Sequence, residues 1–179
     1  LESIFHGTSL LCEIPSGMLA DRFSYKANLY LARLASIMSS ILILLGQGNF
    51  WIYAIAMMVN AWSYNFDSGT STAFLYDSAV EAGQKDRYLQ ISSFLSGVAE
   101  VTRTLGTVVA GFFVHGALAW TYHIAIGLSL VSILLIFLMK EPETKSDERD
   151  RLTLKRILVV VKQEWQEKPV LFYWMLTYQ

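Results

Sequence analysis

The chain has 179 residues, of which 54% are hydrophobic and only 16% are charged, and its mean hydropathy is +0.40. Because soluble domains average about 25% charged residues, this composition favours a membrane protein. The formal net charge of −1 argues against a nucleic-acid-binding protein, and the single cysteine excludes an internal disulfide and a cysteine-based metal cluster.

Five apolar segments are long enough to cross a bilayer, which takes about 20 residues of helix. They cover 1–20, 27–47, 50–78, 89–115 and 119–139. A sixth begins near Pro169. The runs are too long and too continuous for barrel strands, so we expect an all-α, polytopic membrane bundle. The chain opens with Leu1, shows no cleavable signal peptide and stops inside an apolar run, so we expect it to be a piece of a longer protein.

The positions of lysine and arginine predict the orientation of these helices. The loops after the first and third segments carry basic residues, as does the region after the fifth, whereas the other two loops carry none. Short cytoplasmic loops collect positive charge. We therefore expect a multi-pass protein of the cell membrane, embedded in the lipid bilayer, with its basic loops in the cytoplasm.

The region 141–168 reads as a linker whose first half is polar. In its second half apolar residues recur at helical spacing, namely Leu154, Ile157, Leu158, Val161 and Trp165. This pattern predicts an amphipathic helix on the cytoplasmic membrane surface. An ordinary helix packed against a soluble partner would show the same pattern.

The loop at residues 17–26 reads GMLADRFSYK and closes a predicted helical hairpin. It resembles the loop that joins the second and third helices of the major facilitator superfamily of transporters. The residues that match the family pattern are Gly17, Leu19, Ala20, Asp21, Arg22 and Lys26. Ser24 stands where a glycine is usual, and Tyr25 stands where an arginine is usual. The stretches 13–17, 76–78 and 141–142 are also similar to many members.

The resemblance implies that the five segments are the family's second to sixth helices and that the last run begins the seventh. Residues 1–140 would then be the N-terminal transmembrane bundle without its first helix. Residues 141–168 would be the cytoplasmic linker, and 169–179 the start of the second bundle. Such transporters alternate access between two six-helix bundles, so the remaining half of the same transporter is an expected partner.

The resemblance also implies a cytoplasmic gating loop. In the family the loop aspartate helps to hold the two bundles together, and the usual arginine pairs with an acid at the inner end of helix four. The residues carried over are Gly17, Asp21, Arg22, Lys26 and Asp77. Because Tyr25 carries no charge, Arg22 or Lys26 could take the place of the usual arginine as the partner of Asp77. Alternatively, the two bases only anchor the loop and enforce orientation.

Three charged residues lie deep within the predicted membrane segments. Asp67 lies ten residues before Asp77, or roughly 15 Å from the inner end at the rise of a helix. Glu100 and Arg103 lie roughly 18 and 22 Å beyond Tyr88. A charge at this depth costs several kcal/mol unless it is paired or faces water. We therefore expect Arg103 to pair with Glu100 or with Asp67.

Central polar clusters in transporters bind substrate or coupling ions, so Asp67, Glu100 and Arg103 are candidate substrate or proton-coupling residues. Glu13 and Asn65 join them as further candidates. The alternative is a salt bridge that only fixes helix packing. We expect Arg33, by contrast, to extend its side chain to the inner interface.

These features predict a secondary active transporter of a small organic solute or drug, coupled to protons and without a cofactor. A glycine interval at Gly97 and Gly106 resembles part of a signature of antiporters and favours export. The sequence shows neither a phosphate-binding glycine loop nor a clustered nucleophile and base, so we expect no ATP-driven pump and no enzyme. A non-transporting membrane receptor or scaffold on the same helices stays open as an alternative.

Overall fold

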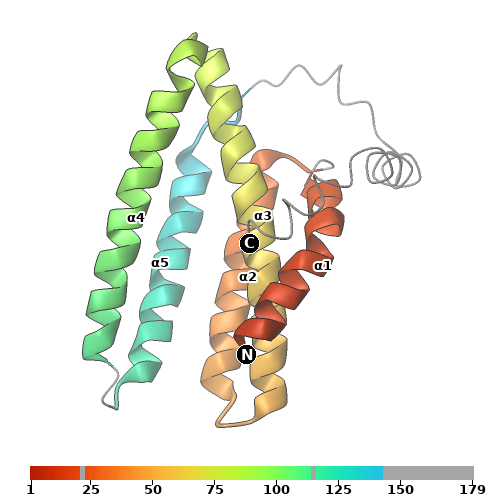
Figure 1. Ribbon diagram of the computed structural model, residues 1–179, viewed down its shortest axis with the longest axis vertical. Helices are drawn as coiled ribbons and strands as arrows, with labels where there is room; N and C mark the ends of the chain where they lie inside the picture. Colours follow the sequence, from red (N-terminus) through yellow and green to blue (C-terminus); the bar gives the residue numbers. More distant parts are fainter. Residues whose placement is uncertain (21–22, 114–115, 143–179) are drawn as a thin grey trace, which may run out of the picture. The chain divides into compact units, whose positions relative to one another are not determined.

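The computed structural model describes residues 1–20, 23–113 and 116–142, with the backbone alone described for 14–20. Its helices are α1 (Glu2–Ala20), α2 (Tyr25–Leu45), α3 (Phe50–Glu81), the 3-10 turn η1 (Lys85–Arg87), α4 (Tyr88–Phe112) and α5 (Leu118–Leu138) (Figure 1). No strand occurs within these described ranges, so the all-α prediction is confirmed. The predicted linker helix and the start of the next bundle lie outside the described residues.

Each of the five expected segments forms one long helix, and local caps explain the shifted ends. The Ser24 hydroxyl accepts from the backbone N–H of Ala27 at 3.2 Å, which starts α2 two residues earlier than predicted. The Asn49 side chain accepts from Trp51 N–H at 3.0 Å and starts α3 where expected. α3 continues to Glu81, three residues beyond the predicted end, and Gly83 follows with a φ of 67°.

Small residues form the contacts between α2 and α3. Ala32, Ala56 and Ala61 are completely buried. The Ser39 hydroxyl donates to the carbonyl of Ala56, and the Ser63 hydroxyl donates to the carbonyl of Ala32, both at 2.8 Å. Small side chains and interhelical hydrogen bonds of this kind are typical of helices that pack in membranes, where backbones approach closely.

The other helices attach to this pair in different ways. α1 packs against α3, and α5 packs against α2 (Figure 1). α4 meets the bundle mainly through η1 and the end of α3. None of the α4 residues is buried in the described chain. α4 therefore presents nearly its whole circumference, and the chemistry of its two faces decides what each face can contact.

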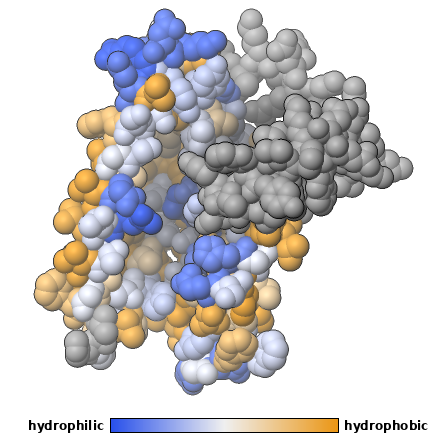
Figure 2. Space-filling model, viewed as in Figure 1, coloured by the Kyte–Doolittle hydropathy of each residue, from blue (hydrophilic) through white to orange (hydrophobic). Residues whose placement is uncertain are grey.

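Two described helices, α2 and α5, are long and apolar enough to cross a membrane by length and composition alone. Large apolar side chains are widely exposed, for example Phe112 at 82% and Leu138 at 77%. Figure 2 shows hydrophobic residues over much of the side surface, with hydrophilic residues gathered at the end where α3 meets α4. Exposed apolar surface of this extent marks a membrane or protein contact.

Candidate functional site

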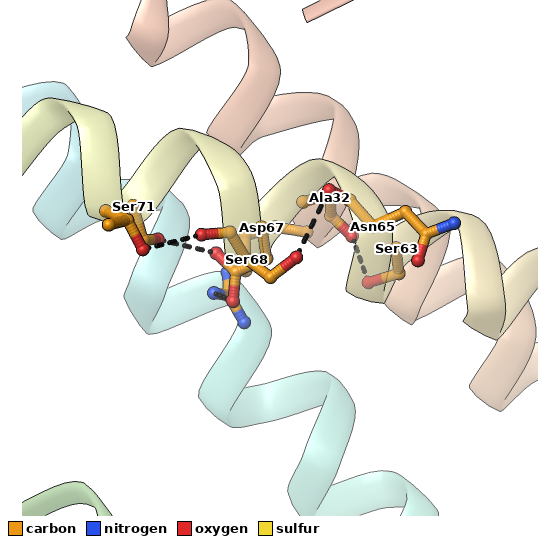
Figure 3. A network of polar contacts seen from close by, with 8 residues as sticks. Ala32, Ser63, Asn65, Asp67, Ser68 and Ser71 are labelled. Carbon is orange, nitrogen blue, oxygen red and sulfur yellow. Dashed lines mark hydrogen bonds and ion pairs between the residues drawn. The ribbon is translucent and has the colours of Figure 1, made fainter. Parts of the chain in front are cut away.

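Asp67 on α3 pairs with Arg33 on α2, with 2.7 Å between Arg33 Nη2 and Asp67 Oδ2. The Ser71 hydroxyl donates to the other carboxylate oxygen at 3.2 Å (Figure 3). The two charged side chains are 29% and 34% exposed. The expectation that Arg33 extends to the interface is therefore wrong. The close approach of α2 to α3 brings an opposite charge within reach, so Arg33 is held between the helices.

Glu100 and Arg103 form the second ion pair, within α4. Arg103 Nη2 donates to Glu100 Oε1 at 2.7 Å, and Arg103 Nε donates to Oε2 at 3.2 Å. This is the first of the two pairings expected for Arg103. Their spacing of three residues places both side chains on one helix face. Asp67 pairs with Arg33 instead, so the described chain holds two separate ion pairs rather than one three-charge cluster.

The pair belongs to a polar stripe on α4, which we define as Ser93, Ser96, Glu100, Arg103, Thr104 and Thr107. At about 100° per residue these positions fall within an arc of about 100°. The opposite side of the helix carries Phe94, Val98, Leu105 and Phe112. Figure 2 shows a hydrophilic patch about midway along α4 with hydrophobic surface around it. One face of α4 thus suits water or a polar ligand, and the other suits lipid or apolar side chains.

Asn65 joins α3 to α1 through two hydrogen bonds with Ser9. The Ser9 hydroxyl donates to Asn65 Oδ1 at 2.7 Å, and Asn65 Nδ2 donates to the Ser9 carbonyl at 2.9 Å. Glu13 is exposed and lies one turn beyond Ser9 on the same face of α1. Asn65 and Asp67 are therefore neighbours in sequence that bind different helices, α1 and α2.

The end of the bundle that carries Lys26, Lys85 and Arg87, here called the basic end, holds a polar network. The Tyr25 hydroxyl donates to Asp77 Oδ2, and the Tyr25 backbone N–H donates to Glu141 Oε1, both at 2.7 Å. These bonds join α2 to α3 and to the segment after α5.

Of the two bases expected as partners of Asp77, Lys26 does not pair with it, and Arg22 lies outside the described residues. The Lys26 ammonium donates instead to the carbonyls of Phe137 and Met139, at 3.2 and 2.9 Å. Those carbonyls end α5, where the helix dipole attracts a cation. A tyrosine hydroxyl can donate to a carboxylate without carrying a charge. Tyr25 therefore binds Asp77 through its neutral hydroxyl. Lys26 instead binds the carbonyls at the end of α5.

Gly17, Asp21 and Arg22 complete the predicted gating loop. Gly17 lies in α1, and its helical backbone is described. Asp21 and Arg22 lie outside the described residues. At the same end, Lys140 Nζ lies 3.2 Å from Glu81 Oε1 and joins the segment after α5 to α3. Within the ranges that the structure describes, no group of three potential metal ligands occurs.

A comparison with protein families found that the model described as Major Facilitator Superfamily matches residues 2–178. Searches of curated proteins and of solved structures found no significant match.

Proposed function

Because the chain belongs to the major facilitator superfamily, which implies a membrane transporter, we propose that it is part of a secondary active transporter. It moves a small organic solute or drug across the cell membrane by alternating access, with its basic loops in the cytoplasm. The observation that supports this most is the pair of ionic contacts in mid-helix, Arg33–Asp67 and Glu100–Arg103. Ions at that depth are costly and accompany ion or substrate pathways.

The proposed coupling ion is a proton, taken up by Asp67 or Glu100. Each carboxylate pairs with one arginine. Protonation would neutralise the carboxylate and so release the arginine from the ion pair. The Arg33–Asp67 pair joins α2 and α3, so its release would remove one polar contact between the two helices. Arg103, Asn65 and Glu13 complete the proposed site. We also propose export as the direction, from the glycine interval in α4.

The network at the basic end supports the proposed gate. Tyr25 and Lys26 begin α2 and bind groups of α3 and of the chain at and beyond the end of α5. We propose that these contacts hold this end of the bundle together while the two halves of the transporter move. Gly17, Asp21 and Arg22 would contribute from the adjoining loop.

The test uses the full-length protein in sealed vesicles, with efflux or uptake of candidate solutes measured with and without an imposed pH gradient. We expect a flux that depends on the gradient. Asp67→Asn and Glu100→Gln should each lose gradient-driven transport while inserting normally. Glu2→Gln is a matched control, because its carboxylate is 92% exposed near the start of α1. A flux that ignores the gradient would defeat proton coupling, and the absence of any flux would favour a receptor or scaffold.

A further inference from the structure

The Glu100–Arg103 pair leaves one edge of the guanidinium open. A guanidinium has five N–H donors, and this one uses Nε and one donor of Nη2 on Glu100. Within the described residues, nothing accepts from Nη1 or from the second N–H of Nη2. Both oxygens of Glu100, by contrast, already accept from Arg103. The open edge of Arg103 therefore offers unused hydrogen-bond donors, whereas the charge of Glu100 is already neutralised by Arg103.

The neighbouring stripe residues do not fill the open edge. The hydroxyls of Thr104 and Thr107 donate to the carbonyls of Glu100 and Arg103 in their own helix, at 2.9 and 3.0 Å. The hydroxyl of Ser96, one turn before Glu100, has no partner among the described residues. A ligand on this face would thus meet the free guanidinium edge with a hydroxyl nearby.

The other mid-helix arginine is far less open. The Arg33 and Asp67 side chains are 29% and 34% exposed, whereas those of Arg103 and Glu100 are 77% and 62% exposed. Asp67 is also held by Ser71. Of the two pairs, the one on α4 therefore has both the exposure and the spare donors to receive a ligand.

From this geometry we infer that the solute is an organic anion, whose carboxylate binds the open edge of Arg103. A guanidinium matches a carboxylate through two parallel charge-assisted hydrogen bonds, and Arg103 would then hold Glu100 on one edge and the solute on the other. A cationic solute would have to compete with Arg103 for Glu100. This inference rests on the proposed transport function and names its substrate class.

The experiment measures counterflow by the full-length protein in vesicles with three matched probes: benzoate, benzamide and benzylammonium. They share a ring and differ in charge. We expect benzoate to exchange at least about tenfold faster than the other two, since a charged hydrogen-bond pair is lost with the amide. Arg103→Gln should abolish that preference, and Arg103→Lys should keep part of it, because lysine retains the charge without the fork. Arg87→Gln, an exposed arginine of η1, is the control and should change nothing.

Two results separate the inference from the function on which it rests. Faster exchange of benzamide or benzylammonium, or a benzoate preference unchanged in Arg103→Gln, would overturn the anion assignment and leave transport standing. No exchange of any probe, together with no gradient-driven flux of other solutes, would overturn both.

Discussion

Neutralising the Arg33–Asp67 pair tests whether it holds α2 to α3. Two unit charges 2.7 Å apart attract by about 6 kcal/mol at an effective dielectric constant of 20. Desolvation offsets much of that, and a third of each side chain is exposed. We therefore expect Arg33→Gln or Asp67→Asn alone to destabilise the protein by about 1–3 kcal/mol. Each leaves its former partner as a half-buried charge without a counterion.

The decisive variant combines Arg33→Gln with Asp67→Asn, because it removes both charges at once. It should lose less stability than the two single variants lose together, with a coupling energy of about 1–2 kcal/mol. The assay is reversible denaturant unfolding of the full-length protein in micelles, with Glu2→Gln as the control. Strictly additive losses would refute the reasoning. If the double variant is stable but does not transport, the pair has a role beyond packing.

Three further variants probe contacts outside this pair. Tyr25→Phe removes the hydroxyl that donates to Asp77 at 2.7 Å and should weaken the basic end by about 1.5–3 kcal/mol, seen as faster cysteine labelling near that end; unchanged labelling would contradict the contact. Ser24→Ala should destabilise α2 by about 1 kcal/mol through loss of its cap, measured by denaturant unfolding, whereas Ser24→Asp should not. Gly46→Leu should lower the melting temperature, because a side chain at Gly46 would overlap the ring of Tyr53, and Tyr53→Ala should rescue it.

The sequence was sufficient to predict the helices but not the contacts between them. Apolar runs of membrane length located all five, and the three-residue spacing of Glu100 and Arg103 made their pairing one of the two that were expected. The partner of Asp67 could not be found this way, because it depends on how α2 and α3 lie against each other. An arginine inside an apolar segment was the available signal for Arg33, since a charge at that depth requires a counterion.

The network at the basic end was missed for a different reason. The family pattern places an arginine where this chain has Tyr25, and an argument from charge alone gave that position no part in binding Asp77. Hydrogen bonding by a neutral hydroxyl restores the contact. The role of Glu141 depends on a backbone N–H as the donor, and side-chain patterns carry no information about such a bond.

The alanine and serine seam between α2 and α3 has a consequence for motion. Long side chains can change rotamer and let two helices slide, but Ala32, Ala56 and Ala61 have none to rearrange, and two hydroxyls fix the axial offset. While the seam is intact, spectroscopic probes on the outer surfaces of these two helices should keep a constant separation as the protein changes conformation. A displacement measured with a probe on either helix would then equal the displacement of the α2–α3 pair as a whole.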